Sequence, residues 1–126
     1  AIYCSHVIEH VPDPRGWLEK MKANLAPGGI ICINIPNMNS YDRKYKRVLK
    51  RLGLRKDKWE KWRTPDHLYE PCERSFLKFA ESCGFDLVKK YSYPSQWTGK
   101  VSPWHYLYHF VLRAGAKGRY YLRPKK

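Results

Sequence analysis

Residues 1–37, AIYCSHVIEHVPDPRGWLEKMKANLAPGGIICINIPN, decide the fold of this chain. The stretch starts with an apolar, β-prone run over residues 1–8 and returns to a nearly all-apolar run, IICINI, at 30–35. Short apolar runs bounded by turn residues are typical of strands that are buried on both faces of a parallel sheet. We therefore predict that these two runs are neighbouring strands of one sheet.

A helix is predicted between the two strands. Asp13 is a suitable N-cap, and Pro14 suits the first helical position because its missing N–H has no intrahelical partner there. Apolar residues recur at helical spacing as far as residue 25, and Gly28 and Gly29 end the run. Strand, helix and strand then form a unit whose crossover is right-handed.

The rest of the chain alternates helical and strand patterns. The expected elements are a basic amphipathic helix near 41–52, a helix at 72–83, a strand at 85–94, an aromatic helix at 103–115 and a strand at 118–124. The predicted fold class is α/β: a Rossmann-like sheet, mostly parallel with an antiparallel last strand, and helices on both faces.

Composition limits the class of protein. The chain has 126 residues, suited to one domain, and carries a net charge of +14 with 43% hydrophobic residues. Between Arg43 and Arg63, eleven Lys or Arg face two acids, a local charge of +9. A second basic cluster lies between Arg113 and Lys126. Such clusters favour nucleic acid, acidic lipid or phosphorylated partners, although a solvated basic face explains them equally well.

The four cysteines show no paired close spacing, and no apolar run approaches the ~20 residues of a membrane span. A reduced, cytoplasmic protein is therefore expected, in contact with a membrane at most peripherally.

His6, Glu9 and His10 spell H-x-x-E-H, a zinc-protease signature in which two histidines on one helix hold the metal. Here the motif leaves an apolar strand, and Pro12 and Pro14 interrupt any helix almost at once. We therefore set the protease hypothesis aside.

Three segments carry a resemblance to class I S-adenosylmethionine-dependent methyltransferases: VIEHVPDP at 7–14, LAPGG at 25–29 with PN at 36–37, and TPDHLYEPCERSFLKFAESCGFDLV at 64–88. GRYYLRPKK at 118–126 resembles the last strand of that family. Among the branches of that family, these motifs most resemble those of the ubiquinone-biosynthesis and small-molecule O-methyltransferase branch. The resemblance implies S-adenosylmethionine as the methyl donor.

One part of the family pattern is missing, the glycine-rich turn after the first strand that approaches the cofactor. No G-x-G occurs in residues 1–126. We therefore expect residues 1–126 to be the carboxyl-terminal portion of a single methyltransferase domain, with poor cofactor binding by itself. Residues 41–66 form a basic helix and loop that could serve as a lid.

The resemblance and the position of the first strand's end together suggest site residues. Strand-end residues in such folds line the ligand crevice, so Cys4, Ser5 and His6 are predicted cofactor contacts. Asn37 and His67 are predicted contacts of the methyl acceptor, although a turn role for Asn37 is equally consistent.

Glu9 and His10 allow three hypotheses. His10 could remove a proton from the acceptor as catalytic base, because histidine titrates near neutral pH. In the ubiquinone branch an acidic residue, this glutamate and this histidine are implicated in holding a divalent metal. His6 stands where that branch has its first acid, so His6, Glu9 and His10 would suit a softer ion than magnesium. The third hypothesis is that Glu9 and His10 only brace the turn.

The predicted function is methyl transfer from S-adenosylmethionine to an oxygen or nitrogen of a small acceptor, which could be anionic or lipid-linked. The alternative is a non-catalytic basic module that binds RNA or an anionic membrane. We favour membrane contact over nucleic acid because no RNA-binding motif is present.

Overall fold

The computed structural model describes residues 1–54, 67–93, 115 and 117–125. The helix expected at 103–115 lies outside the described residues except for Gly115, and the predicted lid is described only to Leu54.

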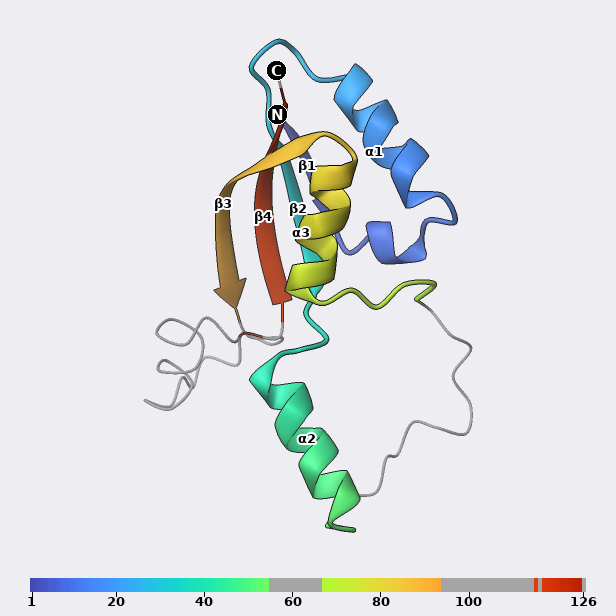
Figure 1. The fold of residues 1–126 in the computed structure, drawn as a ribbon, viewed down its shortest axis with the longest axis vertical. Helices are drawn as coiled ribbons and strands as arrows, with labels where there is room; N and C mark the ends of the chain where they lie inside the picture. Colours follow the sequence, from blue (N-terminus) through green and yellow to red (C-terminus); the bar gives the residue numbers. More distant parts are fainter. Residues whose placement is uncertain (55–66, 94–114, 116, 126) are drawn as a thin grey trace.

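A four-stranded sheet forms the centre of the described structure, with the strand order β1-β2-β4-β3 (Figure 1). β1 and β2 pair in parallel, whereas β4 is antiparallel to both of its neighbours, β2 and β3. The strands are β1 (Ile2–Ser5), β2 (Ile31–Pro36), β3 (Phe85–Tyr93) and β4 (Lys117–Pro124). The predicted α/β fold, with parallel neighbours at the start and an antiparallel last strand, is confirmed.

Two helices cover one face of this sheet, α1 (Pro14–Ala23) and α3 (Glu73–Ser82). Ile31, Ile33 and Ile35 of β2 share one buried cluster with Leu18 of α1 and Phe76 of α3. Right-handed crossovers that step across a sheet in the same direction place their helices on the same face. Helices were predicted on both faces of the sheet. Within the described residues, α1 and α3 cover the same face.

Local sequence explains where α1 begins and where β1 ends. The Asp13 side chain accepts a hydrogen bond from the Gly16 N–H at 2.9 Å, and Pro14 follows as the first helical residue. β1 ends at Ser5, three residues earlier than the apolar run suggested. The reason is His6, whose φ of 55° turns the chain out of the strand, and a short 3₁₀ turn, η1 (Ile8–His10), follows.

The basic helix α2 (Tyr41–Arg51) follows β2 and extends beyond the carboxyl ends of β1 and β2 (Figure 1). Ser40 is its N-cap, and the Ser40 side chain accepts from the Arg43 N–H. Among the described residues, no helix has the length and apolar character needed to cross a membrane.

Candidate functional site

The candidate site lies at the carboxyl ends of the parallel strands β1 and β2, the edge at which open α/β sheets bind ligands. His6 leaves β1 at this edge, and Asn37 follows β2. The 3₁₀ turn and the unusual φ of His6 mean that His6 and His10 do not share a turn of a regular α-helix. The geometry of a helical zinc protease is therefore not formed.

Three side chains converge here: Glu9, His10 and His67. A carboxylate oxygen of Glu9 and one ring nitrogen from each histidine all lie within 4.8 Å of one another. The rings of His10 and His67 meet edge to face, with 4.8 Å between their centroids. Glu9 is fully buried, whereas His10 is exposed to solvent. The cluster thus has a buried carboxyl group on one side and access from solution on the other.

The chain segment that carries His67 is tied to the turn at Glu9. The backbone oxygen of Glu9 accepts from the N–H of Leu68 at 2.8 Å and from the N–H of Tyr69 at 3.2 Å. The Tyr69 hydroxyl donates to the backbone oxygen of Pro12 at 2.8 Å. These hydrogen bonds bring His67 beside His10 although the two residues are far apart in the sequence.

The Glu9 carboxylate is only half satisfied. His6 Nδ1 lies 3.0 Å from Glu9 Oε1 and donates to it, while Glu9 Oε2 is buried with no hydrogen-bond partner in the described part of the chain. A buried carboxylate oxygen without a partner is costly, so such a group normally pairs with a donor or a cation.

Two imidazoles and one carboxylate form a donor set suited to zinc, iron or manganese, with coordination positions left for other ligands. The residues present therefore fit a divalent metal. The structure brings together Glu9 and His10, the two residues predicted as metal ligands. The third member of the cluster is His67 and not His6, which instead orients the Glu9 carboxyl group. His67 was predicted as an acceptor contact, and no local pattern links it to the turn.

The three predicted cofactor contacts are not brought together. Cys4 packs against the buried cluster on the helix-covered face. Burial and the nearby charge of Glu9 raise the pKa of the Cys4 thiol, which keeps it protonated. Ser5 lies on the opposite face, where its hydroxyl accepts from Asn34 Nδ2 at 3.1 Å. Only His6 lies at the strand-end edge beside Glu9, and the roles of all three stay predictions.

Asn37 has partners that fit the turn role. Its side-chain N–H donates to the Gly115 oxygen at 3.2 Å, and its side-chain oxygen accepts from the Asn39 N–H at 3.1 Å. Both ends of the buried amide are therefore engaged by backbone. Acceptor contact by Asn37 stays a prediction.

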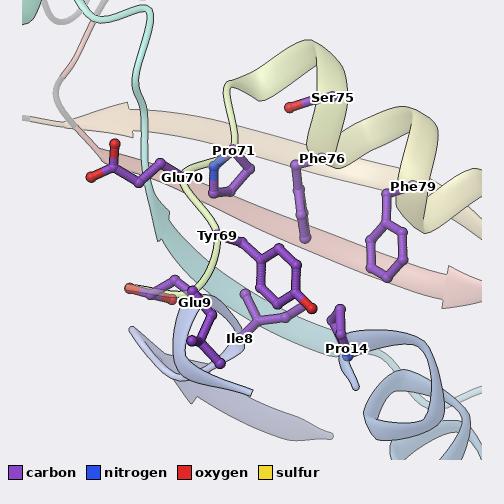
Figure 2. Close-up of a pocket in the computed structure, with 10 residues that line it drawn as sticks. Ile8, Glu9, Pro14, Tyr69, Glu70, Pro71, Ser75, Phe76 and Phe79 are labelled. Carbon is purple, nitrogen blue, oxygen red and sulfur yellow. The ribbon is translucent and has the colours of Figure 1, made fainter. Parts of the chain in front are cut away.

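A cavity of about 500 Å³ adjoins the cluster, between η1, the segment after His67 and α3. Figure 2 shows the rings of Tyr69, Phe76 and Phe79 around it, with Glu9 at the end away from Phe79. The other lining residues are Ile8, Pro14, Leu68, Glu70, Pro71 and Ser75. The pocket is thus mostly apolar, with carboxylates near one end.

Comparison with known proteins agrees with this architecture. A family model described as a methyltransferase domain matches residues 1–90. Among solved structures, the crystal structure of the small RNA methyltransferase HEN1 is similar, with a TM-score of 0.55 and 20% sequence identity. The match covers 98% of this chain and 13% of that chain, and at this identity it shows the fold alone. No curated protein matches the chain.

The family match runs through β1, the turn with Glu9 and His10, β2 and α3. The strand order, with its antiparallel β4, agrees with the class I methyltransferase resemblance stated above. That family implies S-adenosylmethionine as cofactor. With most of its length matched, this chain belongs to the methyltransferase domain family.

Proposed function

We propose that this chain forms the acceptor side of an S-adenosylmethionine-dependent methyltransferase whose acceptor binds beside a divalent metal held by Glu9, His10 and His67. The observation that carries the proposal is the convergence of these three side chains within 4.8 Å, with one buried oxygen of Glu9 unpartnered. Residues 1–126 are then the carboxyl-terminal portion of one methyltransferase domain.

The cofactor supplies an electrophilic methyl group on a positively charged sulfur. A metal at the cluster would act as a Lewis acid that lowers the pKa of an acceptor hydroxyl, whose proton would pass to solvent. The acceptor oxygen would then bond to the methyl carbon as the carbon–sulfur bond breaks, and the sulfur would leave as a neutral thioether. Glu9, His10 and His67 would hold the ion, and His6 orients Glu9 through the 3.0 Å hydrogen bond. In this arrangement the protein's main contribution is to position the acceptor oxygen, a contribution that can lower a barrier substantially.

The alternative role for His10, in place of holding the metal, is that of catalytic base. His10 is exposed at the edge of the cluster, so its ring can reach a hydroxyl in the site and take the proton that the oxygen loses. In either role His10 acts on the acceptor, and not on the binding of the cofactor.

The apolar lining of the pocket favours a small acceptor molecule whose main part is apolar. Aromatic and aliphatic side chains line most of the 500 Å³ cavity, and Glu9 links it to the metal cluster. A hydroxylated aromatic or lipid-linked molecule could place its ring or chain among Tyr69, Phe76 and Phe79, with its oxygen toward Glu9. This acceptor class is that of the small-molecule O-methyltransferase branch.

RNA is the second candidate acceptor. The net charge of +14 favours an anionic partner, and the structurally similar HEN1 is a small RNA methyltransferase. The apolar lining of the pocket favours the small molecule, because ribose and phosphate would bury little against it.

The experiment uses the complete protein after removal of metal with a chelator. Methyl transfer from labelled S-adenosylmethionine to a catechol with an apolar substituent and to a mixed-sequence small RNA is measured before and after addition of Zn²⁺, Mn²⁺ or Mg²⁺. We expect transfer to the catechol to depend on Zn²⁺ or Mn²⁺ and to be lost in His67→Ala. Glu81→Gln, an exposed acid on α3, is the matched control. Full activity without metal would refute the metal site, and preferred transfer to RNA would refute the small acceptor.

A further inference from the structure

Helix α2 has an apolar face that the described part of the chain leaves uncovered. Tyr45, Val48 and Leu52 recur at spacings of three and four, and their exposed fractions are 56%, 52% and 64%. Leu54, just after the helix, is 73% exposed. Residues at this spacing normally face the core of a domain. A contiguous apolar stripe left in solvent marks an interaction surface.

The other faces of the same helix are basic. Six Lys or Arg and one acid lie in Tyr41–Arg51, a net charge of +5. At about 100° per residue, the basic positions occupy the arc opposite the stripe, and Lys44 and Arg51 lie next to its edge. The side chains of Lys44, Arg47 and Arg51 are exposed. α2 therefore combines a narrow apolar stripe with a wide cationic face.

We propose that α2 is an interfacial helix that binds an anionic lipid surface. Tyr45, Val48 and Leu52 would enter the boundary between headgroups and acyl chains, while Lys44 and Arg51 would meet lipid phosphates beside them. A helix with strong amphipathicity, a cationic face and low net hydrophobicity is the kind that lies in the plane of a membrane interface.

The aliphatic stripe favours lipid over RNA. Proteins bind the RNA backbone through basic side chains and bind single-stranded bases by aromatic stacking. Neither contact would bury Val48 and Leu52. A second copy of the chain could cover the stripe, but it would bring two helices of charge +5 together, and like charges at close range oppose such pairing. An anionic surface satisfies the stripe and the charge at once.

The helix also starts beside the candidate active site. The Arg43 guanidinium lies 4.0 Å from Glu70 Oε1, and His67 Nδ1 lies 3.8 Å from the same oxygen. A membrane-bound α2 would therefore hold the metal cluster and the apolar pocket near the lipid surface, where a lipid-linked acceptor is delivered. This last step rests on the proposed function, whereas lipid binding by α2 does not.

The test is co-sedimentation of the complete protein with vesicles of phosphatidylcholine alone, with vesicles of phosphatidylcholine and phosphatidylglycerol, and with a mixed-sequence RNA in solution, at low and high salt. Three double variants are compared: Val48→Ser with Leu52→Ser on the stripe, Lys44→Gln with Arg51→Gln beside it, and Arg74→Gln with Lys78→Gln as an exposed control on α3.

We expect binding to the anionic vesicles alone, weakened by salt because the attraction is screened. The basic variant should lose about 25-fold in affinity at low salt, which is about fivefold for each residue, the equivalent of roughly 1 kcal/mol near an anionic leaflet. The stripe variant should lose at least about tenfold at either salt, because its contribution is burial of apolar surface. The α3 control should bind as the unmodified protein does.

Preferred binding to RNA, unchanged vesicle binding by the stripe variant, or self-association that the stripe variant abolishes would each overturn the proposal. So would failure to bind anionic vesicles at low salt. His67→Ala should lose metal-dependent methyl transfer and keep vesicle binding, which separates a failure of this proposal from a failure of the proposed function. Circular dichroism checks that the variants keep their helices, since the substituted side chains are exposed.

Discussion

The substitution Glu9→Gln tests whether the buried carboxylate exists to hold a metal. Gln keeps the size and shape of Glu9 and removes its charge. In the metal-free protein two effects oppose each other. The charge-assisted hydrogen bond from His6, of the kind that contributes about 1.5–3 kcal/mol, is weakened. The burial cost of the unpartnered Oε2, about 1–3 kcal/mol or more, is relieved. The free energy of unfolding without metal should therefore stay within about 1.5 kcal/mol of the unmodified protein.

The metal-bound protein should respond very differently. Loss of groups that merely support metal ligands costs about 10–100-fold in affinity, so loss of the ligand charge itself should cost at least about 100-fold. At a metal concentration of about 100 times Kd, binding stabilises the native state by about 2.7 kcal/mol, and a 100-fold weaker site retains only about 0.4 kcal/mol. The lost 2.3 kcal/mol or so corresponds to about 5–9 °C in melting temperature for a domain of about 150–250 residues.

The assay is thermal unfolding of the complete protein, metal-free and with added Zn²⁺ or Mn²⁺, for the unmodified protein, Glu9→Gln and the exposed control Glu81→Gln. We expect most of the metal-induced rise in melting temperature to be lost in Glu9→Gln and kept in Glu81→Gln. A full metal-induced rise in Glu9→Gln would refute the reasoning. So would a large loss of stability in the metal-free variant without any metal effect in the unmodified protein, which would assign Glu9 to bracing the turn.

Three further predictions follow from the site and the core. In the complete protein, His10→Ala should lower turnover about 10²–10⁴-fold with little change in cofactor affinity, and unchanged turnover with a lower melting temperature would make His10 a structural residue. Residues 1–126 expressed alone should show negligible heat of binding to S-adenosylmethionine in isothermal titration, and micromolar binding would contradict the proposal that they are one portion of the domain. Tyr120 is 1% exposed with no partner for its hydroxyl among the described residues, and burial raises its pKa. Tyr120→Phe should therefore raise the midpoint of urea unfolding by the equivalent of about 1 kcal/mol, and a lower midpoint would show that the hydroxyl has a stabilising partner.

The elements of the fold follow from local patterns in the sequence. The apolar run in 30–35 became the central strand β2, and Asp13 with Pro14 began α1 as predicted. The amphipathic pattern of α2 and the parallel pairing of β1 with β2 were also predicted correctly. Such features depend on spacing and capping within a few residues, and that information is complete in a single sequence.

What the sequence could not decide is which side chains meet across the fold and which face remains uncovered. His67 reaches Glu9 and His10 because the N–H groups of Leu68 and Tyr69 donate to the backbone oxygen of Glu9, and no local spacing encodes this long-range contact. Cys4 and Ser5 were grouped by sequence, yet the pleat of β1 sends them to opposite faces. The sequence by itself thus determined the elements and the charge of this protein, through short-range periodicity and capping. The tertiary structure alone decided that a buried carboxylate and two histidines share one edge and that the described residues leave the apolar stripe of α2 exposed, because both depend on long-range packing.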